Sequence, residues 1–147
     1  MNEKYEFRQM RQKDIIQVAA LEQEHFPDPW STKSLTDLLV QKCCFGYVLA
    51  QDTAILAYAI TQEVIDEGEL LRIAVWKRHL RQGFGSRLLQ ALLLKAAAVQ
   101  TWNLEVRESN LAARALYKQA GFQTIGTRRG YYYNPTEDAL LMQYKRR

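Results

Sequence analysis

The sequence has little of what cross-links a chain, binds a metal ion or crosses a membrane. Its only two cysteines, Cys43 and Cys44, are adjacent, and neighbouring cysteines rarely pair, which excludes a disulfide framework and a Cys-x-x-Cys metal site. Two buried thiols in an apolar strand are expected instead. His25 and His79 have no metal-ligand companions and are interpreted as surface residues, so no metal is predicted. No apolar run approaches the roughly 18 residues of a membrane span. The charged segment Met1–Arg11 has no apolar centre of a signal peptide, and a cytoplasmic protein is expected.

The composition predicts one globular domain covering residues 1–147. Hydrophobic residues make up 48% of the chain and charged residues 24%, which is enough apolar surface to form a core at this length. The net charge of +4 favours an anionic partner, such as a phosphorylated cofactor or an RNA-rich particle. No block of consecutive lysines and arginines stands out except the short tail Lys145–Arg147, so direct binding of nucleic acid is not expected. A monomer is favoured.

Hydrophobic periodicity predicts alternating strands and helices, hence an α/β or α+β fold with helices packed on a mixed sheet. Asp14 and Ser31 are predicted to cap helices at their N-termini, and Gly121 to end one in a left-handed conformation. Strands are predicted at residues 5–10, 45–51, 55–63, 70–75, 101–107, 123–128 and 139–144, and helices at residues 15–26, 32–40, 87–96 and 110–120.

A glycine loop, Leu80–Ser86, joins a strand to a leucine-rich helix. Gly83 and Gly85 remove the Cβ atoms that would keep a phosphate away, and the free N–H groups of the helix N-terminus attract an anion. The alternative is a plain tight turn. The loop lacks the Lys-Ser/Thr ending of a P-loop and the length of a dinucleotide-binding unit. Four cations surround it, and they either serve a ligand with several phosphates or form a solvated basic face: Lys77, Arg78, Arg81 and Arg87.

The next strand and helix carry a second set of candidate residues. Asn110, Ala113 and Tyr117 share one helix face, whereas Ala112 lies on the neighbouring stripe that can form core. Alternatively, Asn110 is only an N-cap and Tyr117 only a packing residue. Glu105 points away from the apolar side of its strand and is a candidate general base; the alternative is an exposed residue paired with Arg107 or Arg72.

Together these segments resemble the GNAT superfamily of N-acetyltransferases, whose pattern is a strand, a Q/R-x-x-G-x-G/A loop, a helix, a strand and a helix with Asn and Tyr. Leu80 departs from the first loop position, and Arg81 can substitute for it. Within the superfamily the chain most resembles RimI-type enzymes, which acetylate the N-terminal alanine of a ribosomal protein. The segments that carry this resemblance are Asp28–Ser31, Ala59–Gln62, Asp66-Glu67, Ile73–Val75, Leu104–Arg107, Ser109-Asn110, Ala115–Tyr117, Gly121-Phe122, Arg128-Arg129, Tyr131-Tyr132 and Glu137–Ala139.

The resemblance implies a splayed mixed sheet of about seven strands with four helices, and acetyl-CoA as cosubstrate between two parallel strands. It also implies direct transfer in a ternary complex, with Glu105 as base and Tyr117 as acid. The residues that it implies for the cofactor are Ile73, Ala74, Val75, Arg81, Gln82, Gly83, Phe84, Gly85, Ser86, Asn110 and Tyr117.

The substrate implied is the N-terminus of a small-subunit ribosomal protein. The residues expected to bind it are Trp30, Asp66, Glu67, Tyr131 and Tyr132. The acidic pair would attract a basic peptide, and the aromatic residues would form walls, although the tyrosine run could instead pack on the sheet. The alternatives are an enzyme for a small amine, such as a polyamine or an antibiotic, and a coenzyme A-binding module without turnover.

Overall fold

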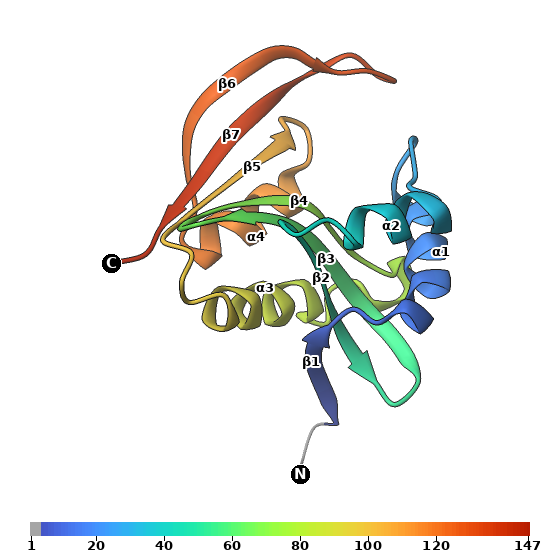
Figure 1. Cartoon of the computed structure of the whole chain (residues 1–147). Helices are drawn as coiled ribbons and strands as arrows, with labels where there is room; N and C mark the ends of the chain where they lie inside the picture. The colour runs from blue at the N-terminus through green and yellow to red at the C-terminus, as the bar shows by residue number, and fades with distance from the viewer. Residues whose placement is uncertain (1–3) are drawn as a thin grey trace.

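The computed structural model describes residues 4–147, so the first three residues of the charged segment Met1–Arg11 lie outside it. Seven strands form one sheet in the order β1-β2-β3-β4-β5-β7-β6, with four α-helices against it (Figure 1). The elements are β1 (Tyr5–Gln9), α1 (Ile15–His25), α2 (Thr32–Leu39), β2 (Cys44–Gln51), β3 (Ala54–Val64), β4 (Glu67–Val75), α3 (Phe84–Lys95), β5 (Thr101–Arg107), α4 (Leu111–Ala120), β6 (Gln123–Tyr132) and β7 (Glu137–Lys145).

The sheet consists of two antiparallel halves joined by one short parallel contact. Strands β1 to β4 form the first half, and β5, β7 and β6 form the second. Strand β4 pairs with β5 only through Glu67–Glu69 and Thr101–Asn103. Beyond these three pairs the strands diverge (Figure 1). The predicted fold class, a mixed and splayed sheet, is confirmed.

Each face of the sheet buries its own core. Successive side chains of a strand point to opposite faces, and in β3 Ala57 and Ala59 meet the α3 core while Tyr58 and Ile60 meet the α1–α2 core. The leucine stripe of α3 is buried as predicted, from Leu88 to Leu93. No helix within residues 4–147 is long and apolar enough to span a membrane.

Strands β4 and β6 extend farthest beyond a predicted end. Strand β4 begins at Glu67 rather than at residue 70, where Glu67–Glu69 pair with β5. At Gly68 the Trp102 ring lies against the backbone, 2.6 Å from where a Cβ would stand. Because a glycine stands between the two glutamates, no alternation of apolar and polar side chains marks the start of this strand in the sequence. Strand β6 continues to Tyr132 rather than ending at residue 128; its side chains are mostly exposed, so no hydrophobic alternation marks its end.

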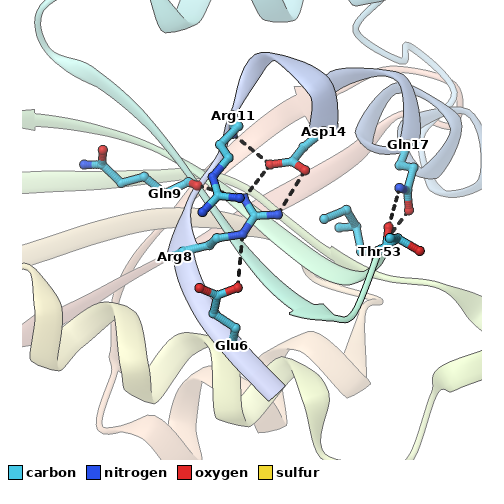
Figure 2. Close-up of polar contacts among 8 residues, drawn as sticks. Glu6, Arg8, Gln9, Arg11, Asp14, Gln17 and Thr53 are labelled. Carbon is cyan, nitrogen blue, oxygen red and sulfur yellow. Dashed lines mark hydrogen bonds and ion pairs between the residues drawn. The ribbon is translucent and has the colours of Figure 1, made fainter. Parts of the chain in front are cut away.

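The prediction that the Asp14 side chain caps α1 is wrong. Asp14 occupies the N-cap position, but its side chain makes no capping hydrogen bond to α1. Its carboxylate instead receives hydrogen bonds from Arg8 Nη1 at 2.6 Å and from the Arg11 backbone N–H at 2.8 Å (Figure 2). The buried carboxylate thus ties β1 to the start of α1, since a buried charge requires a charged partner.

The other two predicted helix caps, one at a start and one at an end, are confirmed. The Ser34 N–H donates to Ser31 Oγ at 3.0 Å and starts α2, and Gly121 ends α4 with a φ of 108°. Of the two cysteines, only Cys44 is buried in a strand; Cys43 is half-buried in the preceding turn.

Candidate active site

The gap between β4 and β5 displays the Glu105 carboxylate on the α1–α2 face. Trp102, Leu104 and Val106 are buried against the α3 side, so Glu105 points the other way and is half-buried. Within residues 4–147 it makes neither a hydrogen bond nor an ion pair. Arg107 pairs with Glu137 at 3.3 Å instead, and Arg72 with Glu22 at 3.4 Å. The interpretation of Glu105 as their exposed partner is therefore wrong.

Glu69 is a second carboxylate in this gap and lies outside the set of residues predicted for the site. It is the last β4 residue paired with β5, and its neighbours Gly68 and Leu70 face the α3 core, so Glu69 shares the Glu105 face. Burial and the charge of Glu105 raise the pKa of Glu69, which Arg128 partly offsets. Alternation of Glu67 and Glu69 was the only available signal, and it fell outside the predicted strand.

Two tyrosines adjoin the site: Tyr132 lies next to Glu105, and Tyr117 lies next to Tyr132. Tyr117 is 7% exposed and packs its ring 5.8 Å from that of Phe122. Within the described part of the chain, no hydrogen bond reaches its hydroxyl. Burial and the nearby Tyr132 raise the pKa of Tyr117. Burial and the Glu105 charge in turn raise the pKa of Tyr132 to about 12. Both phenols therefore keep their protons at neutral pH, as a proton donor must.

The glycine loop has the backbone shape of an anion cradle. Gly83 is the N-cap of α3 with a φ of 79°, and Arg81 also has a positive φ, of 66°. The first helical hydrogen bond runs from the Arg87 N–H to the Gly83 carbonyl at 3.0 Å, so the N–H groups of Phe84, Gly85 and Ser86 precede it and lack helical partners. A Cβ on Gly83 would meet nothing within 4 Å. The loop is therefore open to a ligand, and Leu80 beside it is exposed.

The predicted basic cluster surrounds this loop. Lys77, Arg78 and Arg81 are exposed where β4 leads into the loop, and Arg87 is exposed on the first turn of α3. Multiple cations at the positive end of a helix suit a ligand with several phosphates.

The main chain of β4 supplies the edge between the loop and Glu105. Ile73, Ala74 and Val75 pair with β3 on one side but have no strand on the side of the gap, because pairing with β5 has ended. Apart from the Val75 carbonyl, the polar groups on that edge have no strand partner within residues 4–147 and are open to a ligand. The His25 ring contacts the Val75 carbonyl and is half-buried, so its interpretation as a surface residue is wrong.

Asn110 is an N-cap, one of the two roles considered for it. Its Oδ1 accepts the Ala113 N–H at 3.1 Å, which leaves the amide nitrogen as the group that could donate to a cofactor. Ala113 packs on the core together with Leu116, whereas Ala112, expected in the core, is exposed.

Comparison with known proteins identifies the family. A sequence profile of the acetyltransferase (GNAT) family matches residues 15–122. The chain belongs to this family. It is 41% identical over 135 residues to the ribosomal protein bS18-alanine N-acetyltransferase of Escherichia coli strain K12, covering 88% of this chain and 89% of that protein.

Two further comparisons agree with this assignment. The Haemophilus influenzae protein of the same name is 37% identical over 134 residues, covering 88% of this chain and 90% of that one. The crystal structure of the ribosomal-protein-S18-alanine N-acetyltransferase from Escherichia coli matches with a TM-score of 0.87 and 36% identity, covering 96% of this chain and 93% of that one. The resemblance inferred from the motifs is confirmed, and the chain is an N-acetyltransferase of the GNAT family.

The residues predicted for the substrate lie in two places within this GNAT fold. Tyr132 lies next to Glu105. The Tyr131 ring stands edge-on to the Tyr132 ring, with 5.0 Å between the two ring centroids. Asp66 and Glu67 lie where β4 and β5 are still paired, and Glu67 is opposite Thr101. Thr101 is four residues before Glu105 on β5, which is about 13 Å at 3.3 Å per residue. The structure therefore gathers the tyrosines around Glu105 and sets the acidic pair apart.

Trp30 lies in the α1–α2 segment, on the same face of the sheet as Glu105. It is half-buried and packs against the α1–α2 core. Tyr133, next to the paired tyrosines, is 75% exposed, so the tyrosine run does not simply pack on the sheet. No group of three His, Cys, Asp or Glu side chains that could hold a metal ion occurs within residues 4–147.

Proposed function

We propose that this GNAT enzyme transfers an acetyl group from acetyl-CoA to the N-terminal alanine amine of a small-subunit ribosomal protein. The observation that carries the proposal is the free, half-buried Glu105 carboxylate beside Tyr132, which in turn neighbours Tyr117, close to the point where two parallel strands separate. The activity named for its relatives, N-acetylation of an alanine of ribosomal protein bS18, supports the substrate. The proposal also places the enzyme in the cytoplasm, together with its ribosomal-protein substrate.

The proposed cofactor path follows the open groups of the site. The segment Arg81–Ser86 would hold the pyrophosphate through backbone N–H groups at the positive end of α3. The free edge of Ile73–Val75 would hydrogen-bond the pantetheine arm, as a strand edge does with an extended ligand. The Asn110 amide nitrogen would donate to a carbonyl of the same arm.

The proposed reaction needs one base and one acid. Glu105 accepts the proton that the substrate amine loses, directly or through a water molecule, as the nitrogen bonds to the acetyl carbon. Tyr117 donates its proton, or a hydrogen bond, to the sulfur as the carbon–sulfur bond breaks. A peptide α-amine has a pKa of about 8 and a lysine about 10.4, so the α-amine costs roughly 3 kcal/mol less to deprotonate. A single carboxylate therefore suits an N-terminal amine better than a lysine.

A substrate panel tests this proposal. Peptides that begin with alanine or another small residue should be acetylated well, peptides that begin with a large residue poorly, and internal lysines hardly at all. Rates with spermidine and an aminoglycoside complete the panel. A higher kcat/KM for spermidine or for an internal lysine would support the small-amine alternative instead, and no turnover with any amine would support a binding module.

Replacing Tyr117 with Phe should lower kcat about 10- to 100-fold, within the range of a lost proton donor. The substitution removes only a hydroxyl that makes no hydrogen bond within residues 4–147, so the melting temperature and the acetyl-CoA affinity should change little. Steady-state kinetics and calorimetry measure the two effects. An unchanged kcat would show that Tyr117 only packs.

A further inference from the structure

One arginine of β4 holds the segment between α1 and α2, residues 26–31. The Arg72 guanidinium lies 4.0 Å from the centroid of the Phe26 ring and 4.5 Å from that of the Trp30 ring. Its Nη2 donates to the Asp28 carbonyl oxygen at 3.0 Å. A planar guanidinium can contact two aromatic rings and donate in its own plane at the same time, which an ammonium cannot. Arg72 thus contacts three residues of one short segment.

A buried glutamate completes this arrangement. Glu22 of α1 is fully buried; its Oε1 accepts the Trp30 backbone N–H at 2.8 Å, and its Oε2 accepts the Tyr58 hydroxyl. Arg72 Nε lies 3.4 Å from Oε2, close enough for an ion pair although not aligned for a hydrogen bond. Because a buried carboxylate is costly without such partners, these contacts fix the position of Trp30 relative to β3 and β4.

The location of Arg72 links this arrangement to the active site. Arg72 lies on β4 beyond Glu69, where the strand has left β5, and its side chain is on the face that also carries Glu105. A change of the Arg72 side chain should therefore move residues 26–31, which pack on the same face of the sheet as Glu105, while the glycine loop stays in place.

We propose that Arg72 is a specificity-determining positioning residue: by holding Phe26 and Trp30 against β4, it fixes Trp30 as a wall that limits the size of the substrate's first side chain. The inference rests on the proposed peptide substrate. Arg72 itself does not touch the reacting atoms. Loosening the segment should admit larger first residues while the chemistry at Glu105 continues.

Arg72→Lys is the decisive variant, because it keeps a positive charge beside Glu22 but loses the flat contact with both rings. The preference for alanine-starting over leucine-starting peptides, as a ratio of kcat/KM values, should fall at least tenfold. The KM for acetyl-CoA should stay within about twofold. Chymotrypsin should cleave the folded variant faster after Trp30, which reports the loosened segment without any assay of activity.

Arg8→Lys is the matched control. Arg8 is equally buried, with 13% of its side chain exposed against 14% for Arg72, and it also pairs with a buried carboxylate, that of Asp14. It lies on β1, an edge strand that β2 and β3 separate from β4. This variant should lose stability but keep the peptide preference and the cleavage rate at Trp30.

The outcomes are distinguishable. An unchanged preference in Arg72→Lys, in an enzyme that acetylates peptides, overturns the inference even where cleavage increases. An equal loss of preference in Arg8→Lys also overturns it, because the effect would then be general destabilisation. A wild-type enzyme that does not acetylate peptides contradicts the proposed function itself, and unchanged cleavage in Arg72→Lys then shows separately that Arg72 does not hold the segment.

Discussion

Replacing Glu105 with Gln should lower kcat roughly 10²-fold or more, the usual scale for loss of a general base. The amide keeps the size of the side chain and its place on β5 but cannot accept a proton at neutral pH. Acetyl-CoA affinity should change little, because the cofactor path proposed above uses the glycine loop and the edge of β4. Steady-state kinetics with an alanine-starting peptide, together with calorimetric titration of acetyl-CoA, measure both quantities.

Glu69→Gln is the control for this result. Glu69 lies in the same gap on the same face, and the substitution also removes one negative charge, so both variants change the local field to a similar extent. A larger fall in kcat with Glu69→Gln, or with Glu67→Gln, than with Glu105→Gln would mean that the base has been assigned to the wrong carboxylate.

Replacing Gly83 with Val should weaken coenzyme A binding at least tenfold while the protein stays folded. The φ of 79° is a conformation that a β-branched residue avoids, and forcing it costs of order 1–3 kcal/mol. Because a Cβ there would meet no other atom within 4 Å, the substitution creates no clash and the exposed loop can relieve the strain by moving. That movement would misdirect the N–H groups of Phe84 to Ser86.

The Gly130→Val variant provides a matched control for backbone strain. Gly130 has a φ of 62°, and a Cβ there would also meet nothing within 4 Å, but it lies in β6, far along the chain from the loop. The same substitution should therefore leave coenzyme A affinity unchanged. A folded Gly83→Val protein that binds coenzyme A with wild-type affinity would remove the argument for the glycine loop.

The sequence predicts those parts of the fold that local patterns determine. The sequence predicts strand β5 and helix α3 to within a few residues of their ends, because their apolar side chains recur with periods of two and 3.6. Ser31 and Gly121 were recognised because their capping chemistry is local. Asp14 was misread because Arg8, a residue of the neighbouring strand, competes for its carboxylate.

The arrangement around the gap depends on contacts that no local pattern contains. Strand β7 inserts between β5 and β6, and the β4–β5 contact stops after three pairs; both follow from packing between distant segments. The sequence alone therefore does not place Glu69 beside Glu105. For the same reason, Glu22 looks like a surface residue in the sequence, yet Tyr58, Trp30 and Arg72 bury it completely.

The central claim, that this enzyme acetylates an N-terminal alanine amine, is tested most directly by locating the transferred group. The substrate is one synthetic peptide that begins with alanine and also contains an internal lysine, incubated with isotope-labelled acetyl-CoA and an equal concentration of spermidine. Tandem mass spectrometry then assigns the label. The account predicts label on the alanine α-amine alone; label on the lysine side chain, or mainly on spermidine, would contradict it.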